Sequence, residues 1–168
     1  MPKSLADGHK KVAILTTKPA NPAAPTVAEL NAGIDASCAI LFSDFTWSAA
    51  DSDTVDEKAL CDVGNATAYG ASNWDGGMTL FRYFTSGGAA DATADTAYTA
   101  TKVKGTTLWI YVRDTSKLST AAWAAADEIY LGGEVLTDTP QAGEGTGYIK
   151  RRIPLAFQKG YDNIAAAA

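Results

Sequence analysis

The chain has 168 residues, of which 46% are hydrophobic, and a formal net charge of −5. This length corresponds to a single domain, residues 1–168, with a sizeable core. No stretch approaches the roughly 20 apolar residues of a membrane-spanning helix, so no contact with a membrane is expected. No apolar segment follows the charged N-terminus, which therefore does not predict a secretory signal, and the chain is expected to fold in the cytoplasm. The acidic balance argues against a dedicated nucleic-acid-binding surface.

The first 24 residues are polar and then rich in proline and alanine, as in KPANPAAP. Prolines at 19, 22 and 25 exclude a helix or a central strand there. We expect residues 1–24 to form an extended arm or a loop, and a disordered tail fits the composition equally well.

Two helices are predicted. Thr26 and Glu29 have the spacing of a capping box at the start of a short helix, which Gly33 ends. A longer helix is predicted over residues 91–103, with alanines and a tyrosine on one face and Gly105 as its stop.

Runs of β-branched and aromatic residues predict at least five strands, and they occur in succession rather than in regular alternation with helices. This order predicts a mainly β (α+β) fold, an antiparallel β-sandwich or small barrel flanked by one α-helix, with a core over residues 25–157 and a C-terminal tail over 158–168. The predicted strands lie within 38–47, 78–84, 106–113, 128–136 and 148–157.

Some segments within this pattern have special features. Residues 54–61 fit a strand or a helical turn equally well, and residues 64–77 have the glycines and asparagines of turns. The pair Gly132-Gly133 predicts a bulge, and Pro154 predicts an edge or bulged strand. Residues 137–147 read as a long mobile connection.

Residues that carry chemistry are few. His9 is the one histidine and lies in the polar N-terminus, so a nucleophilic serine or cysteine has no candidate base in the folded region. Cys38 and Cys61 lack metal-ligand spacing and are expected to be two buried thiols. The acidic stretch 51–62 lacks the EF-hand pattern, and GEGTG (143–147) lacks the context of a nucleotide loop. We therefore expect no enzyme, no metal and no cofactor.

One long segment, DFTWSAADSDTVDEKALCDVGNATAYGASNWDGGMTLFRYF (44–84), resembles the core of the major tail proteins, or tail tube proteins, of bacteriophages with long, non-contractile tails, in particular those that infect actinobacteria. The segments TVAELNAGID, KVKGTTLWIYVRD and GYIKRRIPLAF occur in the order of that family. The resemblance thus covers most of the chain.

This resemblance implies a β-sandwich or barrel whose subunits join into rings, commonly of six, that stack into the tube through which DNA leaves the virion. It implies that termini, a long hairpin and loops bridge subunits, and that the tape measure protein and the tail terminator and tip proteins are partners. It also implies assembly in the host cytoplasm and a final place in the phage tail.

Two charged segments are candidates for the contact between subunits. Lys150, Arg151 and Arg152 form the one basic run of three residues, and the acidic stretch that includes Asp53, Asp56 and Glu57 is its electrostatic complement. The hypothesis is that these groups meet across subunits; the alternative is that each is a solvated face. Residues 1–24 and 137–147 are long enough to reach a neighbour.

The acidic charge also suits a conduit, because an acidic lumen repels DNA and lets it pass without specific binding. One alternative function remains at this point. A capsid decoration protein or an adhesin-like β-sandwich binding module is equally β-rich, acidic and devoid of a catalytic set, and differs in its partner.

Overall fold

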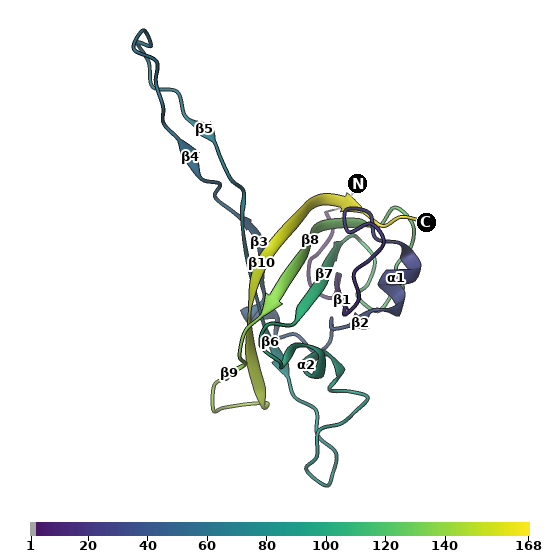
Figure 1. The fold of residues 1–168 in the computed structure, drawn as a ribbon. Helices are drawn as coiled ribbons and strands as arrows, with labels where there is room; N and C mark the ends of the chain where they lie inside the picture. Colours follow the sequence, from purple (N-terminus) through teal and green to yellow (C-terminus); the bar gives the residue numbers. More distant parts are fainter. Residues whose placement is uncertain (1–2) are drawn as a thin grey trace.

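A computed structural model describes residues 3–168 (Figure 1). Within these residues the chain forms an eight-stranded antiparallel sheet, a separate two-stranded ribbon and two short α-helices, which confirms the mainly β, antiparallel fold predicted from the sequence. In spatial order the large sheet runs β2 (Ile34–Asp35), β1 (Lys10–Leu15), β7 (Thr107–Asp114), β8 (Glu128–Thr137), β10 (Lys150–Ala165), β6 (Asn73–Phe81) and β3 (Thr46–Ala50), with β9 (Gln141–Ala142) paired to β10.

Both faces of the central strands are buried. Successive residues of a strand point to opposite faces, so β7 contributes Ile110 to one core and Tyr111 to the other. The larger core also contains Leu131 and Ile153, while the smaller one lies beneath helix α1 (Val27–Ala32). A continuous apolar run such as TLWIYV is therefore needed where the sheet is covered on both sides.

The sheet bends so that its edge strand β3 lies against β8. The indole Nε1 of Trp47 in β3 donates to the carbonyl oxygen of Leu131 in β8 at 2.9 Å, inside the larger core. Helix α2 (Thr96–Thr101) packs against β2 and β6 and covers one end of that core.

The glycine pair in β8 does not form the predicted bulge. Gly132 and Gly133 stay in register with Tyr111 and Ile110 of β7. A Cβ at Gly133 would lie 2.3 Å from the ring of Phe157, so the pair makes room for aromatic rings. The register shifts lie elsewhere, one of them in β10 between Phe157 and Lys159.

The N-terminal arm and the C-terminal tail are both shorter than predicted. Within the predicted arm 1–24, of which residues 1–2 lie outside the described residues, β1 is an inner strand of the sheet. The prolines constrain only the loop that follows it. The predicted tail 158–168 continues β10 as far as Ala165, because pairing with β8 resumes after the register shift. This shift interrupts the alternation of apolar and polar residues by which the sequence would have indicated a strand.

Helix boundaries differ in one case. The capping box of Thr26 and Glu29 is present as predicted at the start of α1. The helix predicted over 91–103 is shorter in the structure and consists of α2 alone. The Asp91 carboxylate accepts hydrogen bonds from the amides of Thr93 and Ala94, which makes this segment a turn, and the side chain of Asp95 binds Arg82.

Pro154 predicted that its strand lies at an edge or is bulged. Strand β10 is an inner strand, so the edge is wrong, and it has a register shift three residues after Pro154, between Phe157 and Lys159. On the side of β10 that faces β8 and β9, pairing with β8 begins only at Leu155 and pairing with β9 involves Arg151 and Arg152. The missing backbone N–H of Pro154 therefore costs no hydrogen bond between strands on that side. Its carbonyl accepts from the amide of Asp138 at 3.1 Å.

Candidate assembly interface

Strands β3 and β6 continue beyond the sheet as a long two-stranded hairpin that projects from the body of the molecule (Figure 1). We call residues 51–72 the hairpin arm. Within it, β4 (Thr54–Val55) pairs with β5 (Ala68–Tyr69), which resolves the open question about residues 54–61 in favour of a short strand leading into a turn. No residue of the arm is buried.

The hairpin arm accounts for most of the net negative charge of the chain. It contains five carboxylates and one lysine, a net charge of −4, whereas the whole chain has −5. The rest of the molecule is therefore close to neutral. The charged residues of the arm are Asp51, Asp53, Asp56, Glu57, Lys58 and Asp62.

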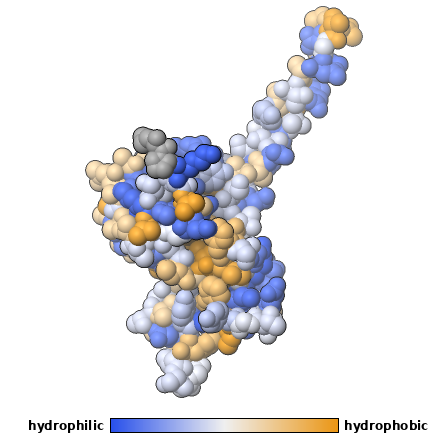
Figure 2. Space-filling model, turned by 180° about the vertical axis from the view of Figure 1, so that it is seen from behind, coloured by the Kyte–Doolittle hydropathy of each residue, from blue (hydrophilic) through white to orange (hydrophobic). Residues whose placement is uncertain are grey.

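Apolar side chains are also exposed on the arm, and Figure 2 shows them gathered at its far end. Leu60 and Val63 at the tip are fully exposed, and Val55 and Tyr69 are exposed along the stem. A lone two-stranded hairpin is marginally stable in water. An arm of this kind gains stability when another surface covers it.

The three acidic residues predicted for the interface all lie on the arm. Asp56 accepts a hydrogen bond from the hydroxyl of Thr67 at 2.8 Å, and Asp53 accepts one from Asn73 Nδ2 at 3.0 Å. These bonds link the two strands of the stem. Glu57 is exposed and makes no hydrogen bond or ion pair within residues 3–168.

The three basic residues begin β10, at the end of the sheet away from the arm. Lys150 lies 3.6 Å from the carboxylate of Glu144, and Arg152 donates to Asp44 at 2.6 Å. Arg151 donates only to the carbonyl of Lys150, so among the three it alone lacks a carboxylate partner within residues 3–168.

Asp44 is already committed to contacts within the chain. The Thr79 hydroxyl donates to it, and this hydrogen bond, together with Arg152, lowers the pKa of the Asp44 carboxyl despite partial burial. Arg152 is therefore tied to its own subunit.

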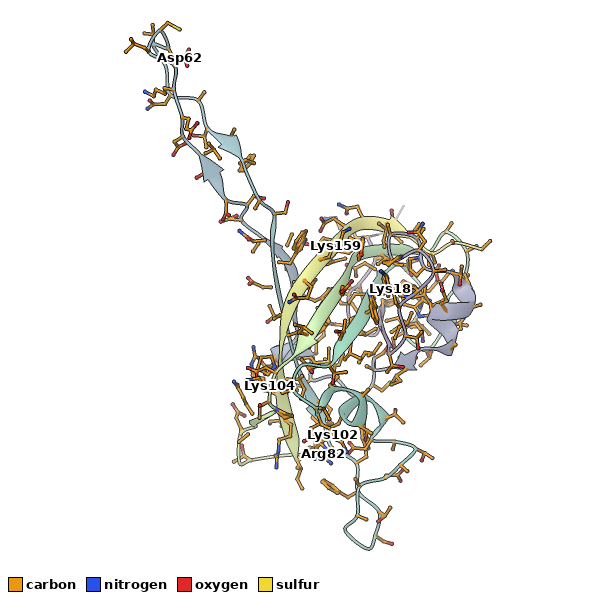
Figure 3. The ribbon with its side chains drawn as sticks, in the orientation of Figure 1. Lys18, Asp62, Arg82, Lys102, Lys104 and Lys159 are labelled. Atoms are coloured by element: carbon orange, nitrogen blue, oxygen red, sulfur yellow. The ribbon has the colours of Figure 1, made fainter. Side chains whose placement is uncertain are left out.

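The structure does not bring the acidic and basic groups together within one chain. Figure 3 shows Asp62 at the tip of the arm and Lys104 at the opposite end of the sheet. Lys104 pairs with Asp138, which neighbours β10, so this pair adds no net charge to that end. Exposed Tyr148 and Ile149 lie beside the basic run. We call this region the basic end; its four cations and their three carboxylate partners, Lys104, Lys150, Arg151 and Arg152 with Asp138, Glu144 and Asp44, sum to a net charge of +1. It is weakly basic, opposite in sign to the arm, and it also exposes apolar side chains.

The two segments expected to reach a neighbour are partly engaged in strands of their own chain, and their contact with a neighbour stays a prediction. Residues 137–147 fold back, and β9 pairs with β10 of the same chain. Of residues 3–24, the six that form β1 belong to the sheet of the body. The resemblance implied a long hairpin, and the structure contains one at residues 51–72. The residue pattern did not locate it, because a two-stranded ribbon without a buried face has no hydrophobic alternation to recognise.

Other functional sites find little support. Within residues 3–168, no three His, Cys, Asp or Glu side chains are grouped so that they could hold a metal ion. Cys38 and Cys61 are exposed, which corrects the expectation of buried thiols, since both lie in surface turns. Neither helix within the described range has the length and apolarity to cross a membrane.

The family model for phage tail tube proteins matches residues 1–168, the full length of the chain. The chain belongs to the phage tail tube protein family. No curated protein matches its sequence. Membership of this family implies a structural component of the virion and self-assembly into a tube, and it suggests a role other than catalysis. The match favours the tail tube protein over the capsid decoration or adhesin-like module that the sequence had left open.

Proposed function

We propose that this tail tube protein forms closed rings of six subunits, and that the rings stack into the tube of a phage with a long, non-contractile tail. A head-to-tail contact that closes gives a ring, and a second such contact between rings gives a tube. The observation that carries the proposal is the hairpin arm, which is exposed over its whole length, apolar at its tip and charged along its stem.

In this proposal the arm of one subunit docks on the basic end of a subunit in the next ring. The arm carries a net charge of −4, and the basic end presents Arg151, which has no carboxylate partner among the described residues. Leu60 and Val63 would lose their exposure against apolar side chains such as Tyr148 and Ile149. Opposite charge steers such a contact, and burial of apolar surface stabilises it.

The finished tube is the conduit for DNA, which passes through the lumen without specific binding. The tape measure protein and the tail terminator and tip proteins bind its interior and its ends, and assembly takes place in the cytoplasm of an actinobacterial host. These parts of the proposal rest on family membership and on the acidic balance of the chain.

Electron microscopy of the concentrated, purified protein tests the proposal. We expect rings or hollow tubes built from one repeating subunit, and fewer of them as the salt concentration rises, because salt screens the attraction between exposed charges. A protein that stays monomeric under all conditions and labels phage capsids rather than tails would show instead that it is a decoration module.

Reversal of one charge tests the docking contact. We expect Arg151→Glu to lower the yield of tubes at least tenfold, because loss of a charge pair at an interface costs about 2–5 kcal/mol and about 1.4 kcal/mol corresponds to tenfold. Tube yield is measured by sedimentation at fixed protein concentration.

Lys18→Glu is the matched control. This substitution changes the charge by the same amount, and Lys18 is an exposed loop residue elsewhere on the body (Figure 3). It should assemble like the wild type. Equal losses in both variants would mean that net charge, and not a contact at Arg151, controls assembly.

A further inference from the structure

Trp74 joins the root of the hairpin arm to strand β10. Strands β6 and β10 pair as far as Gly76 and Leu155 and then separate. Trp74 lies two residues beyond this last pair, where β6 leads into the arm, and its indole Nε1 donates to Asp162 Oδ1 at 2.9 Å. The side chain thus bridges two strands at the point where their backbone hydrogen bonds end.

Strand β10 is shaped to receive this indole ring. A Cβ at Gly160 would lie 2.3 Å from Trp74 Cε2, so any side chain there would displace the ring. The ring also stacks on Phe157, with 6.1 Å between centroids and 29° between planes. The register shift of β10 falls between Phe157 and Lys159, directly before Gly160.

The other strand of the root is fixed separately. The Tyr130 hydroxyl lies 3.4 Å from both Ser48 Oγ and the amide nitrogen of Ala49 in β3. Asn73 Nδ2 donates to the carbonyl of Asp51 at 3.0 Å and so ties the two strands of the root together. Beyond Asn73, the arm makes no hydrogen bond to the body anywhere in the described part of the chain.

We propose that the contact of Trp74 with Gly160 and Asp162 sets the direction in which the hairpin arm leaves the body, which makes Trp74 a positioning residue for docking of the arm on a second copy of the chain. This inference rests on the proposed function. A long arm held only at its root amplifies a small change of angle into a large displacement of its tip. Fixing that angle in the free subunit also lowers the conformational entropy lost on docking.

The two native cysteines allow a direct test in the full chain. Cys38 lies in the body and Cys61 at the tip of the arm, and both are free and exposed. Spin labels on these two residues report the distribution of body-to-tip distances by pulsed electron resonance. Trp74→Phe keeps a ring but removes the N–H donor. We expect a broader distribution of body-to-tip distances and about tenfold fewer tubes, which corresponds to the loss of one hydrogen bond.

Two variants of Asp162 give a matched pair, and because Asp162 is exposed neither threatens the core. Asp162→Leu removes the acceptor and should reproduce the broad distribution and the loss of tubes. Asp162→Asn keeps an oxygen acceptor and should behave like the wild type. Trp123→Phe removes an indole N–H that has no partner within residues 3–168, and should leave both measurements unchanged even where it lowers the melting temperature.

An unchanged distance distribution in Trp74→Phe and Asp162→Leu would overturn the inference, and so would a broad distribution with normal tube yield. These outcomes differ from failure of the proposed function. If a chain with a truncated arm still forms tubes, the docking of the arm in the proposed function fails, whatever Trp74 does. If truncation abolishes tubes while both substitutions are neutral, only the positioning role fails.

Discussion

A chain in which residues 56–67 are replaced by Asn-Gly is expected to remain a folded monomer and to form no tubes. Val55 and Ala68 are paired partners, so a two-residue turn between them preserves the register of the stem. The replaced segment includes the exposed apolar tip, and its hydrogen bonds all lie within the arm. The body should therefore keep its stability while the docking surface is lost.

Thermal unfolding and electron microscopy of the same preparation check both halves of this expectation. A conservative control is Leu60→Ala with Val63→Ala, which keeps the arm and its charges but removes the apolar tip, and we expect an intermediate yield of tubes. Normal tubes from the truncated chain would exclude any need for the arm in stacking.

Arg113→Ala should strongly destabilise the folded subunit. Arg113 is completely buried, and its guanidinium pairs with Asp127 at 3.2 Å. Removal of one member of a buried ion pair typically costs about 3–5 kcal/mol, a large part of the roughly 5–15 kcal/mol that stabilises a domain. The guanidinium also donates to the carbonyls of Leu118, Ala121 and Ala122, which hold the loop between β7 and β8.

Burial acts to raise the pKa of Asp127, but the hydrogen bond from Lys117, the amide of Ala124 and the charge of Arg113 together lower it below its ordinary value. The carboxylate therefore stays charged, and without Arg113 it is left poorly compensated. Urea unfolding of the monomer measures the effect. Lys117→Ala removes a half-exposed partner of the same carboxylate and should cost at most about 1 kcal/mol. Equal losses in the two variants would contradict a special role for the buried guanidinium.

Local signals in the sequence predicted local structure well. Thr26 and Glu29 specify the start of α1 through contacts within one helical turn, and the apolar run of β7 identifies a strand covered on both faces. Long-range features were missed. The strand at 10–15 is stabilised by pairing with β7, about a hundred residues away, and the second half of β10 is hidden by its register shift.

The sequence predicted which charged residues belong to the candidate interface, but not where they lie in the fold. The acidic residues Asp53, Asp56 and Glu57 and the basic run at 150–152 stood out by charge. That they lie on a projecting arm and on the opposite end of the sheet depends on which strands pair, and no local pattern encodes this. Their proposed meeting across subunits stays a prediction.

The uneven distribution of charge makes each subunit an electric dipole. Its negative pole is the arm, with a net charge of −4, and the remainder of the chain is close to neutral with a basic end. In the proposed head-to-tail stack the dipoles of the subunits would add, so the filament would have a direction and two chemically unlike ends. One end would present acidic, apolar arms, and the other would present basic surfaces on which no arm is docked. Under this proposal, the proteins that begin and close the filament would need surfaces of opposite charge, and neither would replace the other.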